Sequence, residues 1–241
     1  MSILPQGAAG ALAGIGRPMS AALLPGSCVL CGADSGAAAL CPPCLGDLPS
    51  LPAARCPQCA EATTHGERCG RCLAHPPAFD GTLALYRYAF PLDRLVHALK
   101  YGHQLALARC FGQALAAALP AEPFDRVVPL PLHPERLRER GFNQAGEIAR
   151  CLARAARRGS DPDCLERLRA TPPQASLPLA ERAANVRRAF GCRRDLTDES
   201  ILLVDDVMTS GATLDEAART LKLHGAATVW VAVIGRALRS G

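Results

Sequence analysis

Short, mostly apolar runs alternate with runs of helical spacing through the C-terminal two thirds of the chain. The short runs predict four strands, at 83–89, 126–130, 201–204 and 227–233. Apolar residues three and four positions apart predict four helices, at 92–100, 105–119, 144–157 and 212–223. Between the second strand and the third helix we expect an arginine-rich loop. Strands that alternate with helices are typical of a parallel sheet covered on both faces, so we expect an α/β domain over residues 80–238.

The N-terminal part of the chain has a different pattern. Residues 1–27 are rich in alanine, glycine and proline and carry one charge, Arg17, which predicts a poorly ordered leader; Met19 is an alternative start. Residues 28–75 hold eight of the twelve cysteines. These eight form four Cys-x-x-Cys pairs: Cys28 and Cys31, Cys41 and Cys44, Cys56 and Cys59, Cys69 and Cys72. Nine residues separate the two pairs of each half, and the second half repeats the first at an offset of 28 residues.

This spacing predicts two zinc ribbons, one after the other. Two thiolates three positions apart can reach one metal ion from a tight turn, and a second such pair completes a tetrahedral set of four sulfurs. Gly32 and Gly70 supply the permissive backbone that such turns need. A structural zinc ion contributes about 10–16 kcal/mol of apparent binding free energy, which stabilises a segment too poor in large apolar residues to fold alone. Equal spacing favours sequential sites, and interleaved pairing of the four Cys-x-x-Cys pairs remains open.

Other uses of the cysteines explain the pattern less well. A disulfide framework requires secretion, and no basic region followed by an apolar stretch precedes the cysteines. Thioredoxin-like redox chemistry uses one Cys-x-x-Cys pair beside a βαβ unit, and an iron–sulfur cluster has a tighter triple spacing. The remaining four cysteines, at 110, 151, 164 and 192, are interpreted as ordinary buried thiols.

Composition and charge narrow the class of protein. With 49% hydrophobic and 20% charged residues the chain can form a packed core, which excludes wholesale disorder. No apolar run approaches the ~18 residues of a membrane-spanning helix, so we expect no membrane insertion and a cytoplasmic location. Residues 126–194 carry 15 arginines against 7 acidic residues, an excess that suits a polyanionic ligand. Aromatic residues make up only 4%, which argues against a large base-stacking platform.

The stretch from Ile201 to Thr213 carries the most specific chemistry. Four apolar residues predict a buried strand, and Asp205 and Asp206 follow at its carboxyl end, where open parallel sheets bind ligands. The turn that comes next can wrap a phosphate with backbone N–H groups and hydroxyls at a helix N-terminus. Its residues are Thr209, Ser210, Gly211, Ala212 and Thr213. Paired carboxylates can accept hydrogen bonds from a vicinal diol, so a phosphorylated ribose fits both halves of the stretch.

This stretch resembles the motif of type I phosphoribosyltransferases, which bind 5-phosphoribosyl-1-pyrophosphate (PRPP) with Mg²⁺. The resemblance implies that Asp205 and Asp206 hold the ribose hydroxyls and that residues 209–213 bind the 5-phosphate. Further motifs resemble the ComF family of competence-associated proteins. They are Val128–Gln144, Ala98–Gly102, Thr171–Leu177 and Glu181–Phe190. The order of parts, cysteine ribbons followed by a transferase-like domain, is also similar to that family.

Cations in the same half of the chain suit a pyrophosphate. Arg136, Arg138 and Arg140 follow a predicted strand, and guanidinium groups bind phosphate oxygens in bidentate fashion. Gly141 permits a tight turn, and Asn143 can donate to an anion. Spacing by two positions argues against one helical face and for an extended or looped segment. The alternative interpretation is that these arginines serve only solubility. Lys100 is either a further cation of the site or the solvated end of a helix.

Three functions remain open on the sequence. In the first hypothesis the protein acts in DNA uptake and utilisation during natural transformation, with a PRPP-binding pocket and single-stranded DNA among its partners. Alternatively, it is an active phosphoribosyltransferase that transfers the phosphoribosyl group of PRPP to an unidentified acceptor in nucleotide salvage or biosynthesis. In the third hypothesis the ribbons dock a partner, such as a protein of the competence machinery, and the pocket is vestigial. The first is the function that the family resemblance favours.

Overall fold

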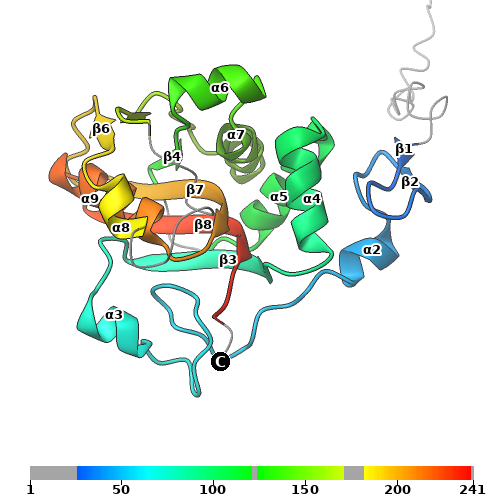
Figure 1. Ribbon diagram of the computed structural model, residues 1–241, viewed down its shortest axis with the longest axis horizontal. Helices are drawn as coiled ribbons and strands as arrows, with labels where there is room; N and C mark the ends of the chain where they lie inside the picture. Colours follow the sequence, from blue (N-terminus) through cyan, green and yellow to red (C-terminus); the bar gives the residue numbers. More distant parts are fainter. Residues whose placement is uncertain (1–25, 121–123, 171–181, 240–241) are drawn as a thin grey trace, which may run out of the picture.

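The fold is seen in a computed structural model of the 241-residue chain, which describes residues 26–120, 124–170 and 182–239 (Figure 1). The predicted leader lies outside the described residues except for Gly26 and Ser27. The motif Thr171–Leu177 also lies outside them.

A four-stranded parallel sheet forms the centre of the molecule. Its strands are β3 (Gly81–Arg87), β4 (Arg126–Pro129), β7 (Ser200–Met208) and β8 (Thr228–Arg236). They lie in the order β3-β8-β7-β4 and are all parallel, with Ile201 of β7 opposite Arg126 of β4 and Val229 of β8. The α/β fold class predicted from the alternating pattern is therefore confirmed.

Helices cover both faces of the sheet (Figure 1). On one face lies α9 (Ala212–Leu223), near the short helix α8 (Arg182–Val186). On the other face lie α4 (Leu92–Tyr101), α5 (Leu105–Ala117) and α7 (Gln144–Ala156). The strands divide their side chains accordingly: Ile201 and Leu203 of β7 pack with α9, whereas Leu202 and Val204 pack with the other helices. Because side chains alternate along a strand, a continuous apolar run is required wherever both faces are covered.

The predicted arginine-rich loop is wrong: residues Pro134–Arg140 form the helix α6. Proline at the first position supplies a backbone already suited to a helix, and the His133 side chain caps its N-terminus by accepting from the Glu135 N–H. Gly141, with a left-handed φ of 80°, ends the helix. The expectation failed because these capping signals enclose a short segment whose one large apolar residue, Leu137, is exposed and gives no apolar periodicity.

A small antiparallel pair of strands stands apart from the central sheet. It consists of β5 (Leu165–Arg167) and β6 (Phe190–Cys192), with Glu166 opposite Gly191. The same pair brings Cys164 Sγ and Cys192 Sγ to 3.9 Å from each other. Of the four scattered cysteines, only Cys164 is buried, whereas Cys110, Cys151 and Cys192 are partly exposed. The interpretation as ordinary buried thiols therefore holds fully for Cys164 alone.

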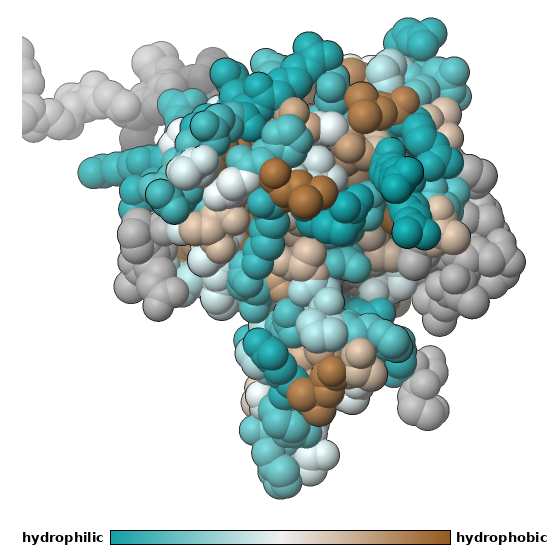
Figure 2. All heavy atoms as spheres, turned by 90° about the vertical axis from the view of Figure 1, so that its left-hand side faces the viewer, coloured by the Kyte–Doolittle hydropathy of each residue, from teal (hydrophilic) through white to brown (hydrophobic). Residues whose placement is uncertain are grey.

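Two small cysteine-rich units precede the α/β fold. Ribbon 1, residues 26–48, contains β1 (Gly26–Ser27), β2 (Asp34–Gly36) and α2 (Pro42–Gly46). Ribbon 2, residues 51–75, contains α3 (Gly70–Ala74). Ribbon 1 lies beside α4, and ribbon 2 lies below β3 (Figure 1), where it projects as a lobe (Figure 2). No helix among the described residues is both long enough and apolar enough to cross a membrane.

Candidate functional site

Each ribbon gathers four cysteines around one point. Every Sγ of a group lies within 4.8 Å of the other three, and the groups are Cys28, Cys31, Cys41 and Cys44, and Cys56, Cys59, Cys69 and Cys72. The pairing is therefore sequential, which resolves the alternative that the spacing left open. α2 and α3 each begin directly after the first cysteine of the second pair, so the two ribbons have the same local design.

The distances between sulfurs fit a zinc ion. A tetrahedron of sulfurs at ~2.3 Å from zinc has edges of about 3.8 Å. Between the two Cys-x-x-Cys pairs of ribbon 1, Cys31 Sγ and Cys41 Sγ are 3.7 Å apart; in ribbon 2, Cys59 Sγ and Cys69 Sγ are 3.5 Å apart. The two tetracysteine groups thus fit two structural zinc ions, each with four protein ligands and no position left for a substrate.

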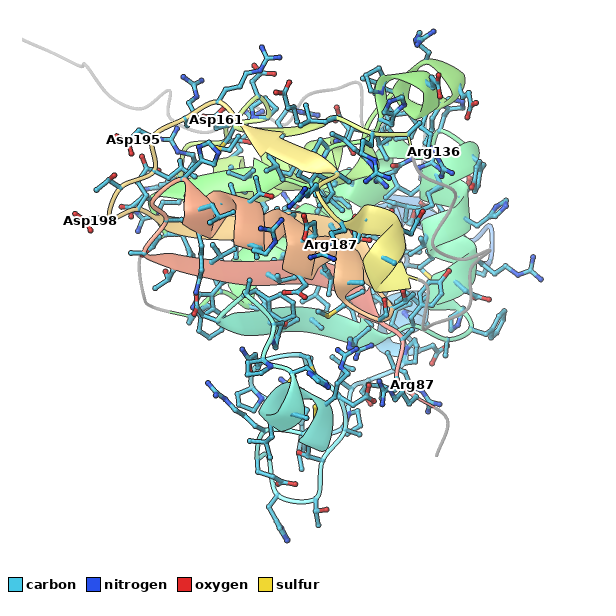
Figure 3. All side chains as sticks on the ribbon, turned by 60° about the vertical axis from the view of Figure 1, so that its left-hand side comes forward. Arg87, Arg136, Asp161, Arg187, Asp195 and Asp198 are labelled. Atoms are coloured by element: carbon cyan, nitrogen blue, oxygen red, sulfur yellow. The ribbon has the colours of Figure 1, made fainter. Side chains whose placement is uncertain are left out.

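A cleft of about 310 Å³ lies at the carboxyl ends of the central strands. It brings together residues from β7, the turn that follows it, α4, α6 and β5. Figure 3 shows Arg136 at this end of the molecule, whereas Asp195 and Asp198 lie at the opposite end of the sheet. Of the residues predicted for the ligand site, these line the cleft: Arg136, Arg140, Asn143, Asp205, Asp206, Thr209, Ser210, Gly211, Ala212 and Thr213.

The paired acids of β7 differ in their surroundings. Asp206 is buried and forms an ion pair with Lys100, whose Nζ lies 3.0 Å from Asp206 Oδ2. Burial opposes the ammonium charge of Lys100, but the Asp206 carboxylate outweighs it and raises the pKa of Lys100. Burial, together with the charge of Asp206, raises the pKa of Asp205 to about 7. Lys100, which the sequence left undecided, therefore belongs to the cleft.

The turn after β7 has the geometry of an anion-binding loop. Gly211 adopts a left-handed φ of 81° directly before α9, and a Cβ there would meet Met208 Cε at 3.1 Å. Both the φ and the close approach favour glycine at this position. Ser210 Oγ accepts a hydrogen bond from the Ala212 N–H and so fixes the first turn of α9. A twelve-residue helix that starts at this loop directs the positive end of its dipole toward the cleft.

The structure separates the predicted pyrophosphate residues. In α6, Arg136 and Arg140 are one turn apart and both line the cleft, whereas Arg138 is exposed and is not among the lining residues. Arg140 donates to Gln144 Oε1 at 2.9 Å, and its guanidinium lies over the Tyr101 ring at 5.1 Å. Gly141 contributes by ending α6 and does not line the cleft. The helix, absent from the prediction, is what selects two of the three arginines.

Asn143 serves the scaffold as well as the cleft wall. Its Oδ1 accepts from the Ala145 N–H as the N-cap of α7, and its Nδ2 donates to the Leu130 carbonyl at 3.0 Å. These contacts join the end of β4 to the start of α7. The amide group is therefore already engaged, and its remaining N–H is what a ligand anion could use.

Several lining residues were missed by the sequence. Arg167 of β5 packs its guanidinium over the Phe190 ring at 5.6 Å, and burial together with the charge of Arg136 lowers the pKa of Arg167. Tyr88 and Tyr101 also line the cleft. No local signal marks Arg167, because it reaches the cleft from a three-residue strand that pairs with β6, a strand more than 20 residues further along the chain.

Comparisons with known proteins find a matching family for the cysteine-rich part of the chain and another for the α/β part. Residues 19–73 match the double zinc ribbon domain, and residues 170–239 match the phosphoribosyl transferase domain. The DNA utilization protein YhgH of Escherichia coli O157:H7 is 34% identical over 195 residues, which cover 76% of this chain and 84% of that protein. Competence protein F of Haemophilus influenzae is 27% identical over 82% of this chain and 90% of its own length. The chain belongs to the ComF family.

The chain also has a distant structural similarity to an enzyme of known structure. Glutamine PRPP amidotransferase from Bacillus subtilis, complexed with ADP and GMP, has a TM-score of 0.38 and 22% identity. The similarity covers 52% of this chain and 25% of that structure. At this level it adds nothing to the assignment, which depends on the sequence relatives and the family models.

Proposed function

We propose that this protein acts in the uptake or utilisation of DNA and that its cleft binds PRPP together with Mg²⁺. The names of the relatives support the first half of the proposal. One observation carries the second half: the paired acids, the hydroxyl-lined turn and a group of cations line the same cleft. The tetracysteine sites need reduced thiols, which supports a cytoplasmic location.

The chemistry of the cleft suits the parts of PRPP in order. The carboxylates of Asp205 and Asp206 would accept from the ribose hydroxyls, and the turn at 209–213 would surround the 5-phosphate. Lys100, Arg136 and Arg140 lie on the other walls, where a pyrophosphate group would extend. Mg²⁺ would neutralise part of the pyrophosphate charge when bound with the ligand. The volume of about 310 Å³ is at the small end of ligand sites, which run from ~300 to 1,000 Å³.

Calorimetric titration of Mg²⁺–PRPP into the purified protein tests the cleft. Replacing both acids, Asp205→Asn with Asp206→Asn, removes charged acceptors and should weaken binding by at least ~10-fold, since a hydrogen bond to a charged group contributes ~1.5–3 kcal/mol. The matched control is Glu139→Gln, an exposed acid of α6, which should bind as the wild type does. Equal affinities for all three proteins would mean that the ligand is attracted by net positive charge and not held by these acids.

The excess of arginine supports binding of single-stranded DNA. Among the described residues of 126–194, exposed arginines include Arg138, Arg169, Arg187 and Arg188. Arginines that displace counterions give an affinity that falls steeply with salt. We therefore expect binding of a fluorescently labelled oligothymidine to weaken by at least ~10-fold between 50 and 200 mM salt, measured by fluorescence anisotropy. An affinity independent of salt, or no binding at 50 mM, contradicts this part of the proposal.

The paired acids and the turn favour one further function, transfer of the phosphoribosyl group from PRPP to an acceptor. A deletion strain separates it from the DNA role. Loss of transformation with normal growth supports the DNA role, whereas a requirement for an added nucleobase supports the enzyme. If both phenotypes are absent and the PRPP titration shows no binding, the remaining hypothesis is that the ribbons dock a partner.

A further inference from the structure

We infer that ribbon 2 positions the phosphate-binding turn of the cleft through two arginines, Arg71 and Arg236. Both are positioning residues, since they act on the backbone of the turn from the side away from the ligand. The inference deepens the proposed function and rests on it, because it concerns how the same turn is prepared for a phosphate group.

Arg236, the last residue of β8, connects ribbon 2 to the turn. It is 1% exposed, the largest side chain buried to that extent among the described residues. Its Nε donates to the Cys59 carbonyl at 2.8 Å, and its Nη2 lies 2.9 Å from Glu61 Oε2, so one edge of the guanidinium is held by ribbon 2. From the other edge, Nη1 donates to the Thr209 carbonyl at 2.7 Å and to the Met208 carbonyl at 3.4 Å.

Arg71 makes a second connection, from within the zinc-binding segment itself. It stands between Cys69 and Cys72, and its Nη1 donates to the Ser210 carbonyl at 2.6 Å. A third link comes from the segment that connects ribbon 2 to β3, where the Ala78 N–H donates to Asp215 Oδ1 in the first turn of α9 at 2.7 Å. The carbonyls of three consecutive residues, 208 to 210, therefore accept from guanidinium groups that ribbon 2 supplies or holds.

The orientation of these carbonyls determines what the turn offers to an anion. In a planar trans peptide the C=O and N–H bonds point in opposite directions. When the Thr209 and Ser210 carbonyls point toward the arginines, the N–H groups of Ser210 and Gly211 point away from them. The residues of the turn line the cleft, and neither Arg71 nor Arg236 is among the lining residues. The arginines thus select the peptide orientation that presents N–H donors to a phosphate.

The second zinc site acts on the turn through the backbone of ribbon 2. The Cys59 carbonyl and the Arg71 side chain both belong to the segment whose shape four thiolates set around one metal ion. Without the metal, only a few turn hydrogen bonds and the contacts with the α/β core would hold these donors and acceptors of the described segment in place. Loading of the second tetracysteine site should therefore alter phosphate binding, although no zinc ligand lines the cleft.

Two measurements test the inference: amide hydrogen exchange of the free protein, detected by mass spectrometry, and the affinity for Mg²⁺–PRPP. Arg71→Ala should raise amide exchange over residues 208–213 and weaken binding by at least ~5-fold, with a change in Tm of less than ~3 °C. Arg71→Lys, which keeps a donor, should recover part of both. The matched control is Arg68→Ala, an exposed arginine of the same ribbon, which should match the wild type in both readouts.

A second pair of variants keeps the test decisive if Arg71 contributes little by itself. Arg236→Lys retains the charge but cannot bridge ribbon 2 and the turn, so exchange over 208–213 should rise there too. Unchanged exchange over the turn in both Arg71→Ala and Arg236→Lys overturns the inference. If the wild type shows no affinity for Mg²⁺–PRPP, the proposed function fails, and the exchange measurement still decides whether ribbon 2 positions the turn.

Discussion

Ribbon 1 and ribbon 2 carry the same cysteine spacing, yet they are connected to the rest of the molecule in different ways. The hydrogen bonds described for residues 26–48 stay inside ribbon 1, and the chain directly after it accepts one bond, which the Arg87 N–H of β3 donates to the Pro49 carbonyl. Ribbon 2 bonds to β3, β8 and the turn before α9. A metal-binding motif therefore specifies a local fold but not how that fold is coupled to a site.

Burial shows the same contrast. In ribbon 2, Cys56, Cys59 and Cys72 are at most 1% exposed and pack in the core that includes α9 and the start of the turn. In ribbon 1, Cys31 is exposed, and the buried residues pack with the opposite face of the sheet. Ribbon 2 is thus part of the core that includes α9, whereas ribbon 1 packs into the core on the other face of the sheet, which includes α4.

Removing zinc from one ribbon at a time should give the largest effect and the clearest contrast. Cys69→Ser with Cys72→Ser abolishes the second site and should lower Tm by more than ~10 °C, because several kcal/mol are lost and each corresponds to ~2–4 °C in a chain of this size. Cys41→Ser with Cys44→Ser should lose one zinc per chain with a drop of less than ~5 °C. Differential scanning calorimetry, with metal content measured in parallel, gives both values.

An equal decrease in Tm in the two double variants would contradict the difference between the ribbons. A protein with fewer than two zinc ions per chain in the wild type contradicts the metal assignment itself. If the ribbon 1 variant is the less stable of the two, ribbon 1 and not ribbon 2 supports the core.

The ion pair between Arg236 and Glu61 should show the next largest effect. Arg236→Met leaves Glu61 and several carbonyls without their donor and should lower the free energy of unfolding by ~3–5 kcal/mol. The double variant, Arg236→Met with Glu61→Gln, should lose less free energy of unfolding than the two single variants lose together, because the unpaired carboxylate is then absent. Denaturant titrations of the four proteins measure the coupling.

Ribbon 1 offers the control for this cycle. Asp47→Asn changes an exposed acid there and should alter stability by less than ~0.5 kcal/mol. Strict additivity of Arg236→Met and Glu61→Gln would show that the two side chains do not act as a pair and would weaken the link between ribbon 2 and β8.

The pH dependence of stability should give the smallest effect and should arise in the cleft, not in either ribbon. Because the pKa of Asp205 is raised to about 7 by burial and by Asp206, the folded state binds more protons than the unfolded state between about pH 4 and pH 7. The free energy of unfolding therefore falls as pH rises through this window. Asp205→Asn removes the effect. The free energy of unfolding of the variant, relative to that of the wild type, should therefore rise by at least ~1 kcal/mol from pH 5 to pH 8.

Taking the difference between the two proteins cancels protons released by the zinc thiolates, which both share. A difference that does not change with pH shows that Asp205 is ionised over the whole range and that its pKa is not raised.

Much of the scaffold was predictable because its signals are local. The apolar runs that give β7 and β8 are continuous since both faces of those strands are covered. The spacing of the four Cys-x-x-Cys pairs predicts two tetracysteine groups, and the structure decides that the pairs combine sequentially. The division of the chain at residues 75–80 stays a prediction. The arginine segment was mispredicted because short helices with strong caps need no apolar stripe, and Lys100 could be placed only when α4 was seen to face Asp206.

By itself the sequence determined an α/β sheet, two metal-binding ribbons, and a strand end that carries two acids before a glycine turn. Spacing and periodicity suffice for these, since the groups concerned lie within a few turns of chain from each other. Only the tertiary structure decided which arginines reach the cleft, that β5 adds Arg167, and that Cys59 meets Arg236. Those partners are 177 positions apart in the chain, and they meet because β8 lies beside β3, directly above ribbon 2.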